Sequence, residues 1–444
     1  METTQNTFEQ FKLNRQLLNA IEEAGYTTPT PIQEQAIPLA LAGQDILGIA
    51  QTGTGKTAAY ALPLLMRIKY AQGQHARALI MAPTRELAMQ ISEAIIQLSK
   101  YTDIRTVVLF GGVGPKSQIE AIRDGVDIIV ATPGRFMDLY FREEVTVKHL
   151  NVMILDEADK MMDMGFMPQI RKLLEIIPVK RQNMLFSATF SEKVERLSHE
   201  FLEFPTRIEV TPQATTAEMV SQTLYELPNF HTKMNLLSHL LRDEEVFNRV
   251  LIFTRSREVA GLVHQYLLGR VVREDALRVI HANKGQNTRT NAMEAFREGS
   301  VRVMVATDVV SRGIDITEVS HVINFDVPLM YEDYVHRIGR TGRANHVGQA
   351  ITFMTFADEY HIRKIEKMIR MEIPRTKLPA EIEMMETPRN EMQDMLREID
   401  NQKRKEDPTF LGAFHEKKAY RPPSKFNQKD SRARRGASSR TKKR

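Results

Sequence analysis

The chain has 444 residues, of which 42% are hydrophobic and 26% are charged, and its formal net charge is +5. This length favours two or more globular domains, and the composition excludes a mostly disordered or fibrous chain. Cysteine is absent, which excludes a disulfide framework and a thiolate metal site. The sequence shows neither a secretory leader nor an apolar run long enough to span a bilayer, so we expect a cytoplasmic protein.

Short runs rich in Val, Ile and Phe recur in the first half of the chain, with helical segments between them. They begin at residues 45, 78, 106, 127, 151 and 183. Continuous apolar runs are typical of strands that helices cover on both faces, and repeated β-α units imply a parallel sheet. We therefore predict an α/β, doubly wound domain over residues 1–212.

A polar break precedes a second series of such runs, which begin at residues 250, 277, 301, 321 and 350. The pattern predicts a linker at 213–218, a second α/β domain at 219–375, a helical extension at 376–402 and a basic disordered tail at 403–444. The tail holds the excess of positive charge, and the rest of the chain is net acidic. The tail either adds affinity for nucleic-acid phosphates or only solubilises the chain; Tyr420 and Phe426, on which bases could stack, favour nucleic-acid binding.

A glycine-rich loop lies between the first apolar run and a helix-forming segment. It consists of Ala50, Gln51, Thr52, Gly53, Thr54, Gly55, Lys56 and Thr57. The glycines allow backbone N–H groups to surround phosphates, Lys56 would reach the β and γ phosphates, and Thr57 would bind Mg²⁺. The alternative is a glycine turn beside a solvated lysine, which the strand before the loop and the helix after it disfavour. The loop therefore predicts an ATP site.

Two acids, Asp156 and Glu157, follow the apolar run that begins at residue 151. We place this strand next to the strand of the phosphate loop, so Asp156 is predicted to hold Mg²⁺. Glu157 is the candidate that orients and polarises the attacking water. The alternative, an acidic helix N-cap, would be preferred if Lys56 were absent.

The second series ends in a basic segment from His336 to Arg343 that contains arginines at every third position. Arg340 and Arg343 are predicted to act as arginine fingers on the γ-phosphate, which would make hydrolysis depend on closure of the two domains. The alternative is a basic helix start that faces solvent.

Together these motifs resemble the DEAD-box RNA helicases of superfamily 2, from Phe8 to about residue 360. The resemblance rests on the glycine loop, HRIGRTGR and the segments GYTTPTPIQ (25–33), PTREL (83–87), GG (111–112), TPGR (132–135), DEAD (156–159), SAT (187–189), ATD (306–308) and RGID (312–315). It implies two tandem RecA-like domains, the first with the Q motif, phosphate loop and DEAD box. The bacterial RhlE-like branch looks most similar.

The family resemblance also implies roles for single residues. Phe8 would stack on adenine, Gln33 would read its edge, and Asp315 would meet the ribose. Residues that couple hydrolysis to RNA would be Asp159, Ser187, Thr189 and His336. Residues that contact RNA would be Arg85, Gly112, Thr132, Arg135, Gln286, Arg289, Thr307 and also Arg255. For Thr84 and Thr132, ordinary helix N-capping is the alternative.

The expected activity is that of an ATP-dependent RNA helicase, an RNA-stimulated ATPase that unwinds short duplexes or remodels RNA–protein complexes without reading sequence. An ATP-dependent RNA clamp and a DNA helicase remain alternatives, and a small-molecule kinase is the weakest. The expected partners are RNA and proteins of ribosome assembly or RNA decay, with a monomeric chain. Two departures from the family pattern are His281–Gly285, where His-Gly is frequent, and Val310–Ser311, where alanines are frequent.

Overall fold

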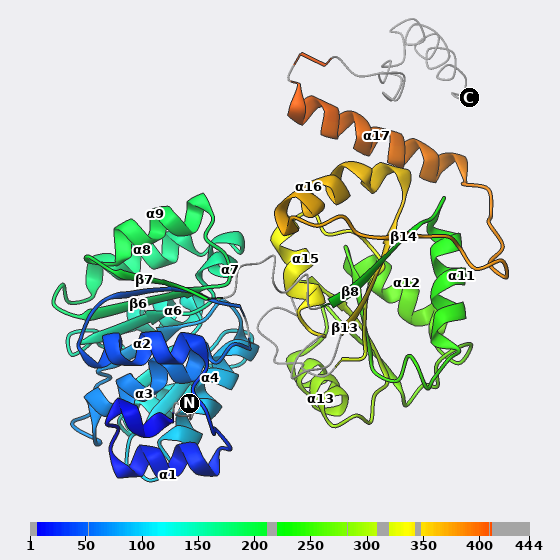
Figure 1. Cartoon of the computed structure of the whole chain (residues 1–444). Coiled ribbons are helices and arrows are strands. Elements are labelled where there is room, and N and C mark those ends of the chain that lie inside the picture. The colour runs from blue at the N-terminus through cyan, green and yellow to red at the C-terminus, as the bar shows by residue number, and fades with distance from the viewer. Residues whose placement is uncertain are drawn as a thin grey trace, which may run out of the picture. The chain divides into compact units, whose positions relative to one another are not determined.

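The computed structural model describes residues 7–51, 53–210, 220–281, 283–308, 319–341, 348–407 and 409–410. The chain divides into two compact units, Met1–Met384 and Met385–Arg444. Within the first unit lie two parallel sheets of seven strands each, and helices flank each sheet (Figure 1). This arrangement confirms the prediction of two tandem RecA-like α/β domains.

The first sheet has the strand order β3-β4-β2-β5-β6-β1-β7, and all of its pairs are parallel. Its strands are β1 (Ile46–Ile49), β2 (Ala78–Met81), β3 (Thr106–Leu109), β4 (Ile128–Ala131), β5 (Val152–Leu155), β6 (Gln182–Ser187) and β7 (Thr206–Glu209). Side chains along a strand point alternately into two cores, as Ile46 and Leu47 do. Both faces are therefore apolar, which explains the continuous apolar runs.

The two faces of the first sheet are covered by different helices. One core includes residues of α1 (Arg15–Glu23), α2 (Pro31–Leu41), α3 (Lys56–Ile68) and α4 (Arg85–Leu98). The other includes residues of α5 (Lys116–Arg123), α6 (Pro133–Phe141), α7 (Ala158–Asp163), α8 (Met167–Ile176) and α9 (Glu192–Phe201). A short 3-10 helix, η1 (Phe8–Phe11), precedes α1.

The second sheet repeats the strand order of the first. Its strands are β8 (Val220–Glu226), β9 (Val250–Thr254), β10 (Leu277–Ile280), β11 (Val303–Thr307), β12 (His321–Asn324), β13 (Gly348–Met354) and β14 (Arg375–Thr376). They are arranged β10-β11-β9-β12-β13-β8-β14. Counted from its own first strand, each sheet has the same order, so β10, β11 and β9 are the counterparts of β3, β4 and β2.

The helices described around the second sheet belong to the same unit. They are α11 (Phe230–Leu241), α12 (Arg257–Leu267), α13 (Gln286–Arg297), α15 (Tyr331–Ile338) and α16 (Glu359–Ile369), with the 3-10 helix η2 (Phe356–Asp358) before α16. Their apolar residues pack in three clusters against the strands.

The second unit contains α17 (Arg389–Glu406). This helix continues past residue 403, where the sequence predicts the tail to begin; Lys403, Arg404 and Lys405 in its last turn favour the helix dipole. The predicted linker 213–218 and tail residues 411–444 lie outside the described residues. Among the helices that the structure describes, none is both long and apolar enough to cross a membrane.

Candidate functional site

The phosphate loop connects β1 to α3, as the sequence predicts. Gly53 and Gly55 have φ angles of 85° and 89°, in the left-handed region that favours glycine. A Cβ atom on Gly55 would also collide with the amide of Gln33. Nζ of Lys56 donates a hydrogen bond to the carbonyl oxygen of Ala50 at 2.8 Å. The loop thus turns closely around the buried Lys56. Thr52, another residue of the predicted site, lies outside the described residues.

Gln33, the last residue of the segment GYTTPTPIQ (the Q motif), binds the phosphate loop through a hydrogen bond. This side chain is only 1% exposed, and its Nε2 donates to the carbonyl oxygen of Gly55 at 3.1 Å. Its Oε1 accepts a hydrogen bond from the backbone N–H of Thr30 at 3.0 Å, at the start of α2. Gln33 is therefore fixed beside the loop that would hold the phosphates.

Two polar groups near the loop support a nucleotide site. Nε2 of Gln51 and Oγ1 of Thr30 are buried and have no hydrogen-bond partner among the described residues. A bound ligand with acceptor and donor atoms could satisfy such groups. Phe8 is buried against Phe11 and Tyr26, at ring-centroid distances of 6.0 and 6.2 Å, and its stacking on adenine stays a prediction.

The acids of the DEAD box follow β5, and here the structure corrects one expectation. The strand of the phosphate loop, β1, is not adjacent to β5, because β6 lies between them and pairs with both. The sequence interpretation missed this because strand order is set by crossovers, not by the order of motifs. The three strand ends nevertheless lie at one edge of the sheet, so β6 adds Ser187 to the site.

Asp156 and Glu157 are both buried. Oδ1 of Asp156 accepts from the backbone N–H of Glu157 at 2.8 Å, and its Oδ2 accepts from the hydroxyl of Tyr60 at 2.9 Å. Burial raises the pKa of Asp156, while the nearby charge of Lys56 opposes that rise. Glu157 is the N-cap residue of α7 by position, but its side chain makes no capping hydrogen bond. The alternative of a plain acidic N-cap is therefore not supported.

The residues around Asp156 fit Mg²⁺. The carboxylate of Asp156 and the hydroxyl of Thr57 are hard oxygen donors of the kind that Mg²⁺ prefers. The described residues contain no group of three or more His, Cys, Asp or Glu that could hold a metal ion by themselves. The two oxygen donors of Asp156 and Thr57 suit Mg²⁺, which takes its remaining ligands from nucleotide phosphates and water.

Tyr60 is a residue of this site that the sequence interpretation missed. If its hydroxyl orients Asp156, Tyr60→Phe should raise the Mg²⁺ concentration for half-maximal binding of a fluorescent ADP about 10- to 150-fold, because a hydrogen bond to a charged group contributes about 1.5–3 kcal/mol. A Mg²⁺ titration at equilibrium measures this. Tyr70→Phe, at a half-exposed tyrosine, is the control, and an unchanged Mg²⁺ dependence of Tyr60→Phe would contradict the role.

The predicted coupling residues of the first sheet do come together. Oδ2 of Asp159 accepts from the backbone N–H groups of Ala188 (3.2 Å) and Thr189 (2.9 Å) and from the Thr189 hydroxyl at 3.1 Å. The backbone N–H of Asp159 donates to Oγ of Ser187 at 3.3 Å. The last acid of the DEAD box is thus joined to the SAT segment. His336 lies on α15, where its Nδ1 is 3.9 Å from Oδ1 of Asp333.

Arginines surround the glycine pair after β3. Arg85 at the start of α4 donates to the carbonyl oxygen of Gly111, and Gly112, with a φ of 82°, has no room for a Cβ beside that guanidinium. Arg135 of α6 donates to Oε1 of Gln118 at 3.0 Å and to the carbonyl oxygen of Val113 at 2.7 Å. The predicted RNA residues Arg85, Gly112 and Arg135 therefore gather at the carboxyl ends of β2, β3 and β4.

The two threonines that precede α4 and α6 differ. Thr84 accepts from the backbone N–H of Leu87 at 3.3 Å, so the capping alternative holds for Thr84. Thr132 precedes α6 without a side-chain capping bond. Its hydroxyl therefore has no capping role in this structure.

The predicted RNA residues of the second domain follow the counterpart strands. Arg255 follows β9, Arg289 lies on α13 after β10, and Thr307 ends β11. Arg255 already donates to Oδ1 of Asp358 at 2.9 Å and to the carbonyl oxygen of Val327 at 3.2 Å, so its role is at least partly structural. The side chain of Gln286 and all of Asp315 lie outside the described residues.

The arginines of the basic segment 336–343 do not share one role. Arg337 is 2% exposed, and its guanidinium donates to both carboxylate oxygens of Asp308 at 2.6 and 2.7 Å. Arg337, which was not among the predicted arginine fingers, therefore anchors the ATD segment. Arg340 is buried, and Arg343 lies outside the described residues.

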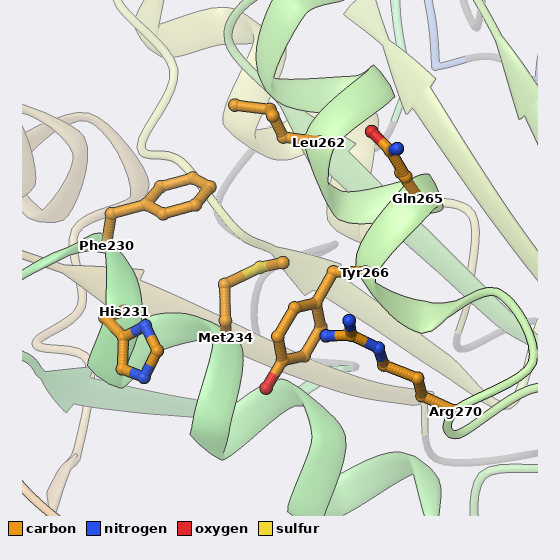
Figure 2. Close-up of a pocket in the computed structure, with 7 residues that line it drawn as sticks. All are labelled: Phe230, His231, Met234, Leu262, Gln265, Tyr266 and Arg270. Carbon is orange, nitrogen blue, oxygen red and sulfur yellow. The ribbon is translucent and has the colours of Figure 1, made fainter.

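A pocket of about 280 Å³ lies between α11 and α12 of the second sheet. Figure 2 shows that Phe230, His231 and Met234 approach it from α11, while Leu262, Gln265 and Tyr266 approach it from α12, with Arg270 beyond the helix end. None of the residues assigned above to ATP or RNA lines this pocket, so it is separate from the predicted sites.

Comparison with known proteins agrees with this geometry. Residues 30–197 match the DEAD/DEAH box helicase family, and residues 232–345 match the helicase conserved C-terminal domain. The DEAD-box ATP-dependent RNA helicase RhpA of Helicobacter pylori is 40% identical over 374 residues, which are 84% of this chain and 75% of that protein. CshA of Bacillus subtilis is 38% identical over 380 residues, 86% of this chain and 76% of that protein.

Among solved structures, S. cerevisiae Dbp5 bound to RNA and ADP BeF3 is similar with a TM-score of 0.75 and 28% identity. The match covers 85% of this chain and 96% of that one. The relatives carry other branch names, so the RhlE-like assignment stays a prediction. Taken with the phosphate loop, the buried DEAD acids and the two RecA-like sheets, these matches show that the chain belongs to the DEAD-box ATP-dependent RNA helicases.

Proposed function

We propose that the chain hydrolyses ATP with Mg²⁺ at the carboxyl ends of β1, β6 and β5, and that this hydrolysis drives local separation of RNA strands. The observation that carries the proposal is the contact of Asp159 with Ser187 and Thr189. It joins the DEAD box to the segment that follows β6 within hydrogen-bond distance. A movement of the DEAD box on ATP hydrolysis would therefore be passed directly to the SAT segment through these hydrogen bonds.

Each residue of the ATP site has a distinct task in this proposal. Lys56 exchanges its bond to the carbonyl of Ala50 for the β and γ phosphates, and Gln33 holds both adenine and the loop at Gly55. Glu157 orients the attacking water. Thr57 and Asp156 would hold Mg²⁺, which neutralises charge on the phosphates.

The RNA surface uses groups that hold a sugar-phosphate backbone. Arginines and a glycine turn gather at the ends of β2, β3 and β4, and this composition favours phosphate contacts over base reading. The similarity to S. cerevisiae Dbp5 bound to RNA supports RNA as the ligand. The binding is therefore proposed to be independent of sequence.

Other properties remain predictions. An ATP-dependent RNA clamp would use the same residues and would differ by slow release of RNA after hydrolysis. We also propose partners from ribosome assembly or RNA decay, a monomeric state and a cytoplasmic location.

The test is steady-state ATP hydrolysis by the full chain with single-stranded RNA, matched DNA or neither, together with displacement of a short labelled RNA duplex. We expect stimulation by RNA, little stimulation by DNA, and ATP-dependent displacement. Equal stimulation by DNA would favour the DNA helicase alternative. Stimulation without displacement, followed by slow RNA release, would favour the clamp.

A further inference from the structure

A buried ion pair joins Glu157 of the DEAD box to Lys160, the residue that follows the DEAD box. No role has been assigned to Lys160 above. Nζ of Lys160 is 2.7 Å from Oε2 of Glu157, and the two side chains are 1% and 2% exposed. Lysine side chains usually extend their ammonium group to water. Lys160 instead points inward to the acid that is proposed to orient the attacking water.

The backbone around this pair is constrained. Glu157 has φ 52° and ψ 51°, a left-handed conformation that is unfavourable for a residue with a Cβ by about 1–2 kcal/mol. The backbone N–H of Glu157 is held by Asp156, and the backbone N–H of Lys160 donates to Oδ1 of Asp159 at 2.9 Å. Both ends of the segment are thus fixed, and the Lys160 ammonium fixes the Glu157 side chain between them.

The position of Lys160 also links two parts of the mechanism. The same Asp159 carboxylate that holds the Lys160 backbone accepts hydrogen bonds from Thr189. An ionised carboxylate is buried only where partners compensate its charge, and the Lys160 ammonium is a partner of Glu157, so loss of Lys160 would weaken the hold on the Glu157 side chain. Burial lowers the pKa of Lys160, and the charge of Glu157 opposes that shift.

We propose that Lys160 is a positioning residue that holds the Glu157 carboxylate in the place from which it orients the attacking water. The inference rests on the proposed role of Glu157 in hydrolysis. It predicts that Lys160 acts on the chemical step and not on nucleotide binding, since the hydrogen bond of its ammonium within the described part of the chain goes to Glu157.

The experiment compares Lys160→Met and Lys160→Arg in the full chain under saturating RNA. Lys160→Met should lower kcat for ATP hydrolysis about 10- to 100-fold, less than loss of a general base itself, which is typically 10²- to 10⁴-fold. The KM for ATP and the equilibrium affinity for a fluorescent ATP analogue should change by less than about threefold. Lys160→Arg should restore most of kcat, because arginine keeps the charge and a donor.

The chain offers a matched control in Lys233. It is also a buried lysine, and its Nζ donates to the carbonyl oxygen of Phe325 at 2.9 Å on the second sheet. Lys233→Met should lower the temperature of unfolding but leave kcat within about twofold of the unmodified chain. This comparison separates a general loss of stability from a specific loss of the chemical step.

The possible outcomes are distinct. An unchanged or increased kcat in Lys160→Met, or a loss that Lys160→Arg does not rescue and that KM shares, would overturn the positioning role. If Lys160→Met does not fold, Lys160→Gln supplies the same comparison, since it keeps a donor without charge. An active Glu157→Gln variant would instead reject the role of Glu157 itself, whatever Lys160 does.

Discussion

Glu157→Gln is expected to lower RNA-stimulated ATP hydrolysis by about 10²- to 10⁴-fold, the range typical of a lost general base. Glutamine has nearly the same shape, and its amide oxygen can still accept a hydrogen bond from Nζ of Lys160, so the fold should persist. It cannot polarise water as a carboxylate does. Steady-state kinetics give the loss, and equilibrium titrations with an ATP analogue and with single-stranded RNA should show nearly unchanged affinities.

Lys56→Ala is the control for this variant, since it should lose affinity for the nucleotide as well as activity. The pair therefore distinguishes a defect in chemistry from a defect in binding. Hydrolysis by Glu157→Gln within about threefold of the unmodified chain would show that another group orients the water.

Arg337→Met should destabilise the second RecA-like domain by about 3 kcal/mol, because the charge-assisted hydrogen bonds of a buried guanidinium are lost while Asp308, 21% exposed, still reaches water. Arg337 binds both oxygens of Asp308, donates to the carbonyl oxygen of Asp326 at 2.7 Å and lies over the ring of Phe253, 5.1 Å from its centroid. Methionine replaces the volume but none of the donors. In thermal unfolding of the full chain, the transition of this domain should fall by roughly 10 °C.

A double-mutant cycle with Asp308→Asn tests whether this ion pair is the cause. The double variant should be less destabilised than the sum of the single changes, because each single change leaves the same interaction broken. Arg337→Lys keeps the charge but cannot donate to both carboxylate oxygens at once. Its free energy of unfolding should therefore lie between those of the unmodified chain and Arg337→Met. A loss below about 1 kcal/mol in Arg337→Met would mean that the anchor contributes little to stability.

The motifs and central strands were predictable because each has a local signal. Apolar runs mark buried strands, and Gly53 and Gly55 mark a turn that needs positive φ. The edge strands β7 and β14 were missed, and so was β8, which lies between β13 and β14. β8 alternates buried and exposed residues, as in VSQTLYE, and that alternation was the available signal; β14 has only two residues.

The side chains that support the site could not be predicted from spacing. Tyr60 meets Asp156 only after α3 packs beside β5, and Arg337 meets Asp308 only after α15 folds back on the second sheet. Their partners are 96 and 29 residues away in sequence. Lys160 lies three residues after Glu157, and this helical spacing was a signal that the two side chains could meet. The spacing does not show that Lys160 points into the protein, because that depends on how the helix packs.

The repeated strand order predicts two RNA-holding surfaces on one chain. Counterpart strands in the two sheets, β2, β3 and β4 and then β9, β10 and β11, each precede residues predicted to hold the backbone. Two modest contacts on one tether raise each other's effective concentration to about the millimolar range, so retention of RNA can far exceed what either half achieves. When one of the two surfaces releases RNA, the other holds it only weakly, so the RNA then dissociates rapidly. An enzyme that binds RNA again in every cycle of ATP hydrolysis needs both strong retention and rapid release.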